Sequence, residues 1–80
     1  MPADNYPQVI LTVDLPAHGL RAGDVGTRVE RHVVPGVGEG WSVEFFDMAG
    51  NTVAVATEPA RHFRLPTAAD RPSARSLAKV

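Results

Sequence analysis

Apolar residues recur at every second position in several short segments of this chain, and glycine or proline separates the segments. The clearest segment spans residues 41–47, where Trp41, Val43 and Phe45 alternate with Ser42 and Glu44. This period of two predicts β-strands that are buried on one face. Because the chain has only 80 residues, it has material for a single domain. The sequence therefore predicts one small all-β domain.

Five strands are expected, and their ranges follow the same alternation: 7–14, 25–34, 41–47, 52–57 and 62–65. We expect Val25 and Val29 of the second strand, and Val53 and Val55 of the fourth, to face the interior. Residues 35–40 include three glycines and one proline, which predicts a loop. Residues 48–51 predict a tight hairpin turn, and Pro59 predicts one helical turn before the last strand.

The connections between these strands favour one architecture. A long first loop, a tight third hairpin and a helical turn before the last strand predict a small five-stranded antiparallel SH3-like barrel, closed and filled by its own side chains. An OB-fold normally has a helix where residues 48–51 stand, so it is disfavoured. The expected organisation is an N-terminal segment (1–6), the barrel (7–65) and a flexible basic tail (66–80).

The composition excludes several kinds of site. Cysteine is absent, so the chain has no disulfide bond, no thiolate nucleophile and no cysteine-ligated metal. The longest apolar runs, such as residues 9–11, are far shorter than the roughly 18 residues of a membrane-spanning helix. The N-terminus has no recognisable secretory signal. We therefore expect a cytoplasmic protein with no membrane association, cofactor or bound metal.

Charge is distributed unevenly along the chain. Residues 1–60 hold three arginines and eight acidic residues, whereas residues 61–80 hold five basic residues and one acidic residue. An acidic body argues against nucleic-acid binding by the barrel, because phosphate neutralisation supplies most non-specific affinity. The basic residues of the C-terminal part are the candidate contacts to a polyanion: Arg61, Arg64, Arg71, Arg75 and Lys79.

The residues around the second strand's start predict a tightly built turn. Gly23 permits a positive φ, and the Asp24 carboxylate can accept hydrogen bonds from nearby backbone N–H groups. Gly26 permits the close passage of a facing strand, and Leu20 is expected to fold under the long first loop as part of the core. Gly50 has a similar turn-forming role in the tight hairpin. We expect these residues to be structural.

The segment from Leu15 to Glu30 resembles a family of small stand-alone bacterial proteins of unknown function, whose pattern is approximately D-L-P-x-H-G-L-x-x-G-D-x-G-T. The later segment from Val43 to Val55 is similar to a second motif of that family. The resemblance covers residues 8–65. It implies an SH3-like or KOW-like β-barrel whose gene often lies beside genes for toxin-like or unknown partners, and it implies no activity.

No arrangement of residues in the sequence predicts catalysis. The three histidines, His18, His32 and His62, are not spaced as metal-binding pairs, and Ser42 does not lie in a nucleophile-elbow context. A barrel of this size also leaves little volume for a concave, water-excluding site. We therefore expect that the protein is not an enzyme.

A binding surface is a stronger expectation. Trp41 begins the third strand beside the glycine-rich loop, where its ring either caps the core or stays half exposed. The other candidate binding residues carry charge or lie on loops: His18, Asp14, Asp24 and Glu44. Recognition of proline-rich peptides is not expected, because the aromatic groove residues of signalling SH3 domains are missing. An exposed strand edge offers a second route to a partner.

Two functions follow as competing expectations. The leading one is a non-enzymatic protein-interaction module that binds a protein partner. The resemblance implies a narrower version, the small neutralising or regulatory member of a toxin-type gene pair. The alternative is a KOW-like nucleic-acid or ribosome-associated module that binds phosphates through its basic tail.

Overall fold

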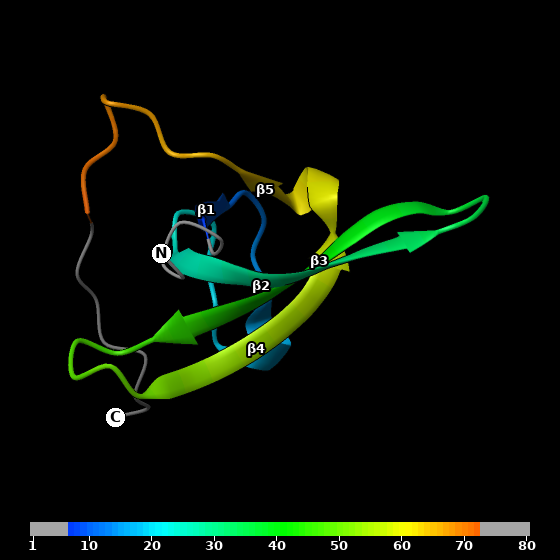
Figure 1. The fold of residues 1–80 in the computed structure, drawn as a ribbon. Helices are drawn as coiled ribbons and strands as arrows, with labels where there is room; N and C mark the ends of the chain where they lie inside the picture. The colour runs from blue at the N-terminus through cyan, green and yellow to red at the C-terminus, as the bar shows by residue number, and fades with distance from the viewer. Residues whose placement is uncertain (1–6, 73–80) are drawn as a thin grey trace.

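The computed structural model describes residues 7–72, which form one five-stranded antiparallel sheet with the strand order β4-β3-β2-β1-β5 (Figure 1). Two 3₁₀ turns, η2 and η3, accompany the strands. Their bounds are β1 (Gln8–Leu11), η2 (Pro16–His18), β2 (Val25–Val34), β3 (Gly38–Phe46), β4 (Thr52–Pro59), η3 (Ala60–His62) and β5 (Phe63–Arg64). The prediction of an all-β antiparallel domain with a helical turn before the last strand is confirmed.

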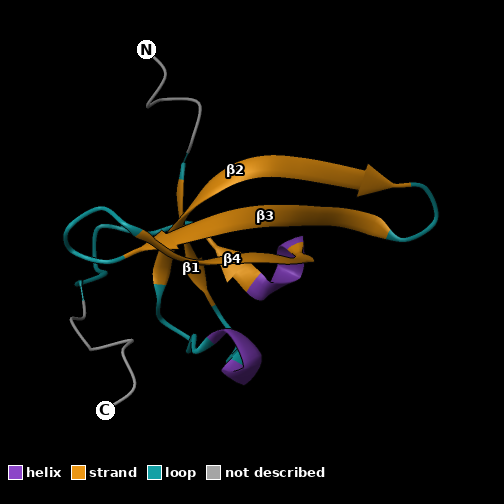
Figure 2. Ribbon diagram, turned by 90° about the horizontal axis from the view of Figure 1, so that it is seen from below, coloured by secondary structure: helices purple, strands orange, loops and turns teal. Residues whose placement is uncertain are grey.

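The sheet does not close into a barrel. Strand β5 contains two residues and pairs with β1, at Ile10↔Arg64 and Leu11↔Phe63. Because β4 and β5 stand at opposite ends of the strand order, each has one edge that pairs with no other strand among residues 7–72. The expectation of closure is therefore wrong: the last strand is too short to bridge back to β4, and the sheet twists around the core instead (Figure 2).

The core lies under the twisted part of the sheet, between β1, β3, β4 and the long first loop. Its buried members are Val9, Leu11, Leu20, Val43, Phe45, Ala56 and Phe63. Leu20 comes from the loop and is 2% exposed, as the sequence predicts for a residue that folds under that loop. Val13, Leu15, Trp41 and Ala54 are half-buried and pack against these residues. Burial of these apolar side chains supplies the main stabilisation of the fold.

The inward faces of β2 and β4 carry small residues, contrary to the expectation from the sequence. Ala56 is fully buried opposite Val43, whereas Val53 and Val55 are 40% and 50% exposed. On β2, Gly26 is buried, while Val25 and Val29 are exposed. The expectation that the four valines face the interior is wrong, because the larger side chains of β3 fill the space.

Gly26 shows how tightly the strands pack. A Cβ atom at this position would lie 2.5 Å from Val43 Cγ1 and 2.8 Å from the carbonyl oxygen of Glu44. Both distances are shorter than real Cβ contacts, so only glycine fits without movement of the neighbouring strand. The predicted close passage at Gly26 is confirmed.

The glycine-rich segment after β2 is mostly strand. Residues 38–40 belong to β3 and pair with β2 at Val34↔Gly38, Val33↔Glu39 and His32↔Gly40. The expected six-residue loop thus shortens to a turn of three residues, closed by a hydrogen bond in which Val37 N–H donates to the Val34 carbonyl at 2.9 Å. Glycine disfavours a strand through backbone entropy, but the neighbouring pairs of this long hairpin hold it in register.

The long first loop is a folded arm. Its two halves pair at Leu15 and Leu20, whose backbone groups exchange two hydrogen bonds of 3.0 and 3.1 Å. The Asp24 carboxylate accepts a hydrogen bond from Arg21 N–H, and Gly23 has a φ of 99°. The turn chemistry predicted for Gly23 and Asp24 is confirmed.

Candidate functional site

The β2–β3 hairpin extends beyond the rest of the sheet (Figures 1 and 2). Its tip carries three exposed valines, with exposures of 72% for Val33, 48% for Val34 and 82% for Val37. We call these three residues the hairpin tip. A group of apolar side chains that a small domain leaves in water at one end of an element is typical of an interaction site.

A β-bulge on β2 determines which side chains accompany the hairpin tip. Arg28 pairs with Val43 and Arg31 pairs with Trp41, with the register shift between Arg28 and Glu30. Residues three apart on a regular strand point to opposite faces. The extra residue of the bulge moves Arg31 to the same face as Arg28.

Trp41 lies at the centre of this face. Its ring stacks on the Phe63 ring with 5.7 Å between centroids. The guanidinium carbon of Arg28 lies 4.8 Å from the centroid of the Trp41 ring, which is a cation–π contact. The indole N–H donates a 2.6 Å hydrogen bond to Glu39 Oε2. Trp41 is half-buried, so it both caps the core through Phe63 and reaches the surface.

Glu39 joins the tryptophan to the second arginine. Its Oε2 atom also accepts a 2.7 Å hydrogen bond from Arg31 Nε. The hydrogen bond from Arg31, followed by the one from Trp41, lowers the pKa of Glu39 from 4.5 to about 2. We call Arg28, Arg31, Glu39 and Trp41 the tryptophan cluster.

The tryptophan cluster predicts a specific titration. In Arg31→Gln the pKa of Glu39 should rise from about 2 toward its ordinary value of 4.5, because the carboxylate loses its strongest donor. The folded pKa lies below the unfolded one, so the associated stabilisation is present above pH 4.5 and is lost as the pH falls toward 2. Carboxyl NMR titration of Glu39 measures the shift. Arg64→Gln, which removes a different ion pair, should leave the Glu39 pKa unchanged, and an unchanged pKa in Arg31→Gln would contradict the assignment.

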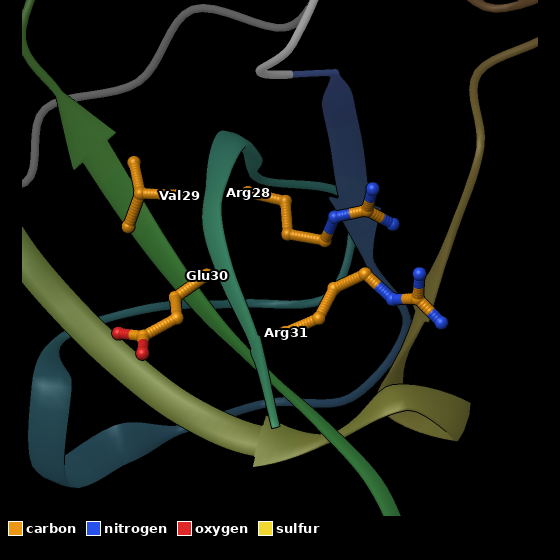
Figure 3. A pocket seen from close by; sticks show the side chains of 4 residues that line it. All are labelled: Arg28, Val29, Glu30 and Arg31. Atoms are coloured by element: carbon orange, nitrogen blue, oxygen red, sulfur yellow. The ribbon is translucent and has the colours of Figure 1, made fainter. Parts of the chain in front are cut away.

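A shallow hollow lies along β2 beside this cluster. It has a volume of about 220 Å³ and is lined by Arg28, Val29, Glu30 and Arg31. Figure 3 shows the two arginine side chains on one side of the strand and Val29 and Glu30 on the other. The hollow is smaller than the roughly 300–1,000 Å³ of small-molecule sites, which favours contact with a macromolecule over enclosure of a ligand.

The opposite face of the hairpin carries a polar row across three strands. His32 Nε2 lies 2.8 Å from Ser42 Oγ, which lies 2.8 Å from Thr57 Oγ1, and Glu30 Oε2 lies 3.9 Å from His32 Nδ1. This order of carboxylate, imidazole and hydroxyl is that of a hydrolase triad. However, Ser42 lies on the interior strand β3, which pairs with both β2 and β4. Its backbone is therefore used by the sheet rather than presented as an oxyanion hole, and we interpret the row as cross-strand stabilisation.

The structure does not bring the candidate binding residues of the sequence together. Trp41 and Glu44 lie on opposite faces of β3, because they stand three positions apart on a regular part of the strand. Asp14 and Asp24 hold the first loop, accepting hydrogen bonds from Ala22 N–H and Arg21 N–H, both at 2.9 Å. His18 is exposed on η2. Of these candidates, Trp41 alone lies in the tryptophan cluster.

The basic residues after β4 are partly engaged within the chain. Arg64 forms a bidentate pair with Asp70, at 2.9 and 2.7 Å, and this pair lowers the pKa of the Asp70 carboxyl well below its usual range. Arg71 donates to the carbonyls of Ala68 and Asp70. Arg61 is exposed on η3. The remaining two candidate phosphate contacts lie outside the described residues: Arg75 and Lys79.

Other titratable groups do not assemble into a metal site in the described part of the chain. His62 Nδ1 lies 2.9 Å from Glu58 Oε1, but residues 7–72 contain no group of three or more His, Asp or Glu side chains placed to hold a metal ion. Within the same range, none of the helical segments has the length and apolar character needed to cross a membrane.

Sequence reasoning missed the partners of Trp41. The sequence gives no sign that Arg28 and Arg31 lie on the same face of the strand, because it is the bulge that brings them there. The sequence predicts a loop at Glu39, whereas this residue lies in β3. The hairpin tip had a visible signal, because Val33, Val34 and Val37 flank Pro35 and Gly36 at a turn, where apolar side chains have little core to enter.

Comparison with known proteins identifies the chain at the level of the family. No curated protein and no solved structure gives a match. The family described as "Domain of unknown function (DUF4926)" matches residues 6–65, which include all five strands, the first-loop arm and the tryptophan cluster. The chain therefore belongs to the DUF4926 family.

Proposed function

We propose that this protein is a non-enzymatic protein-interaction module that binds its partner through the hairpin tip and the adjoining tryptophan cluster. The observation that carries the proposal is the exposure of Val33, Val34 and Val37 at the end of a hairpin that reaches past the sheet. Three neighbouring valines in water are costly for a chain of this size unless a partner covers them.

The chemistry beside the hairpin tip supports the same proposal. Arginine and tryptophan are the residues that most often dominate binding energy at protein interfaces. Here Arg28 and Arg31 flank the half-buried Trp41. A partner that seats an apolar side chain on the valines would place neighbouring carboxylates or carbonyls within reach of the two guanidinium groups.

The hairpin is also preorganised. Its strands stay in register to Val34↔Gly38, and Glu39 fixes both Arg31 and Trp41 through hydrogen bonds to one oxygen atom. A surface that is already ordered loses less conformational entropy on binding. The ordered hairpin therefore favours specific binding of a partner.

The proposal also includes a location, a fold group and a narrower role. We place the module in the cytoplasm of a bacterium and assign the open sheet to the SH3-like group, on the strength of its five antiparallel strands, its long first loop and the turn η3 before β5. Its narrower role as the neutralising member of a toxin-type pair rests on the family resemblance. Co-expression with the product of the neighbouring gene tests that role, with restored growth as the expected result and unchanged toxicity as the contrary one.

The nucleic-acid alternative has weaker support. Arg64 is neutralised by Asp70, and the Arg71 guanidinium is engaged with backbone carbonyls. Both groups would have to give up these contacts to bind phosphate, which reduces the net gain.

Affinity capture from the host cell with three baits tests the proposal. The baits are the wild-type chain, the double variant Val33→Asp/Val37→Asp, and the control Met48→Asp. Met48 is fully exposed in the β3–β4 turn, away from the hairpin tip. We expect one protein to be retained by the wild type and the control and lost with the double variant.

Calorimetry with the purified partner then measures the effect. The double variant should weaken binding at least about 100-fold, because each aspartate places a charge in an apolar contact. Equal binding by all three chains, or no retained protein, would overturn the proposal.

A further inference from the structure

Arg28 differs from the other arginines of residues 7–72. It is half-buried, whereas each of the others is exposed: Arg21, Arg31, Arg61, Arg64 and Arg71. No carboxylate of the described chain forms an ion pair with Arg28, and its guanidinium carbon lies 4.8 Å from the centroid of the Trp41 ring. A cation–π contact provides no oxygen acceptor for the N–H donors of a guanidinium group. Arg28 is therefore a partly desolvated cation whose donors suit an acceptor from a partner.

Two acidic residues on the same face are engaged by other groups. Glu39 Oε2 accepts hydrogen bonds from Arg31 and Trp41. Glu58, which is opposite Trp41 on β4, lies 2.9 Å from His62 Nδ1. The tryptophan cluster itself contains two arginines and one glutamate, so it is a positive spot on a chain body that is acidic over residues 1–60. Such a spot favours a partner that places a negative group at this position.

The register of the hairpin places Arg28 and an exposed valine on one face. Three residues of β2 pair with alternate residues of β3: Arg28↔Val43, Arg31↔Trp41 and Val33↔Glu39. Paired residues share a face, and so do alternate residues of a strand. The distance from Arg28 to Val33 thus corresponds to four positions of β3, which is about 13 Å at the rise of a strand. Figure 3 shows the Arg28 and Arg31 side chains on the same side of β2.

We propose that the partner contacts this surface with an extended acidic segment, which presents a carboxylate side chain to Arg28 and an apolar side chain to Val33. The inference rests on the proposed function, in which this surface binds a protein. Side chains four positions apart on an extended segment match the spacing of Arg28 and Val33, because both chains have the same rise per residue. The guanidinium group binds the carboxylate through two parallel hydrogen bonds, and the Trp41 ring packs against the arginine.

A carboxylate suits this surface better than the phosphates of a nucleic acid. Residues 1–60 hold three arginines and eight acidic residues, so a polyanion that crosses the body meets net repulsion. Glu30 lines the shallow hollow together with Arg28 and Arg31, and Val33 offers an apolar contact that a phosphate does not use. A single carboxylate beside apolar side chains meets one guanidinium group and brings no further negative charge over the acidic residues.

NMR titration of the full chain with two synthetic peptides tests the inference. The peptides are Ac-Leu-Ser-Ser-Ser-Glu-NH2 and Ac-Ser-Ser-Ser-Leu-Glu-NH2, which have the same composition but place leucine four positions or one position from the glutamate. The readout is the side-chain Nε–H signal of Arg28 in the wild-type chain, so it does not depend on the folding of any variant. We expect the first peptide to bind at least about threefold more tightly, because it alone gains the apolar contact with Val33.

Arg28→Gln and Arg61→Gln form a matched pair of variants. Arg28→Gln removes the guanidinium group and should weaken binding of the first peptide at least about tenfold. Arg28→Lys keeps the charge but lacks the forked donors, so it should recover only part of the affinity. Arg61 is exposed on η3, and Arg61→Gln should bind as the wild type does.

Three results would each overturn the inference. Equal binding of the two peptides would remove the spacing, and equal binding by Arg28→Gln and the wild type would remove the carboxylate contact. Tighter binding of a short oligothymidylate than of the first peptide would assign the surface to nucleic acid.

The natural partner separates this inference from the proposed function. If the Val33→Asp/Val37→Asp bait loses the partner and Arg28→Gln binds it with the affinity of the wild type, the proposed function stands and this inference fails. If the double-variant bait retains the partner, the proposed function itself fails.

Discussion

Replacing Phe45 by alanine is expected to remove about 3–5 kcal/mol from the free energy of unfolding. Phe45 is 2% exposed and is the largest of the fully buried side chains. It lies on β3 opposite Ala54, whose small side chain cannot expand into the vacated space. A chain of this length has a total stability of only about 4–12 kcal/mol, so Phe45→Ala should be largely unfolded at moderate urea concentration.

Phe46→Ala is the matched control for this experiment. Phe46 is the next residue on β3 and is 41% exposed, so its truncation should cost less than about 1 kcal/mol. Urea unfolding can be followed by the fluorescence of Trp41, the sole tryptophan, which stacks on Phe63 in the folded state. Similar midpoints for Phe45→Ala and Phe46→Ala would show that the core has been assigned to the wrong face of β3.

The second large effect is expected at Gly26. A single added methyl group would lie 2.5 Å from Val43 Cγ1, 2.8 Å from Glu44 O and 3.0 Å from Phe45 Cδ2. Because one of these atoms belongs to the backbone of a central strand, relief requires β2 and β3 to move apart. We expect Gly26→Ala to lower the free energy of unfolding by about 2 kcal/mol.

Gly40→Ala provides the corresponding control. Gly40 also lies in a central strand, but a Cβ atom there would meet only Glu58 O at an ordinary 3.5 Å. The substitution restricts the unfolded chain without a clash, so stability should stay the same or rise by about 0.5 kcal/mol. If urea unfolding ranks Gly40→Ala below Gly26→Ala, the close approach of β2 and β3 is not the reason for glycine at position 26.

Alternation along the chain predicts the strands of this protein and the inward face of β3, but not the inward faces of β2 and β4. Val53 and Val55 alternate with alanine, and hydrophobicity alone favours the valines as core residues. The decisive quantity is the volume left by the partner strand. Val43 and Phe45 already fill the interior, so Ala54 and Ala56 fit opposite them. That volume depends on register, which is a property of two strands and not of one.

The candidate site was less predictable than the fold. Trp41 was recognisable as a residue at the boundary of core and surface, and it lies there. Its polar partners depend on a single inserted residue in β2, which turns Arg31 to the face of Arg28. No residue type marks the position of that bulge, so the tryptophan cluster follows only from three-dimensional pairing.

The strand order has a consequence for how the chain folds. The β2–β3 and β3–β4 ladders join neighbours in sequence, so they form through short-range closure of two hairpins. The β1–β5 ladder instead joins Leu11 to Phe63, across nearly the whole described chain, through only two residue pairs. The meander of β2, β3 and β4 can therefore assemble first, and the addition of β1 and β5 along the free edge of β2 becomes the slow, entropy-limited step.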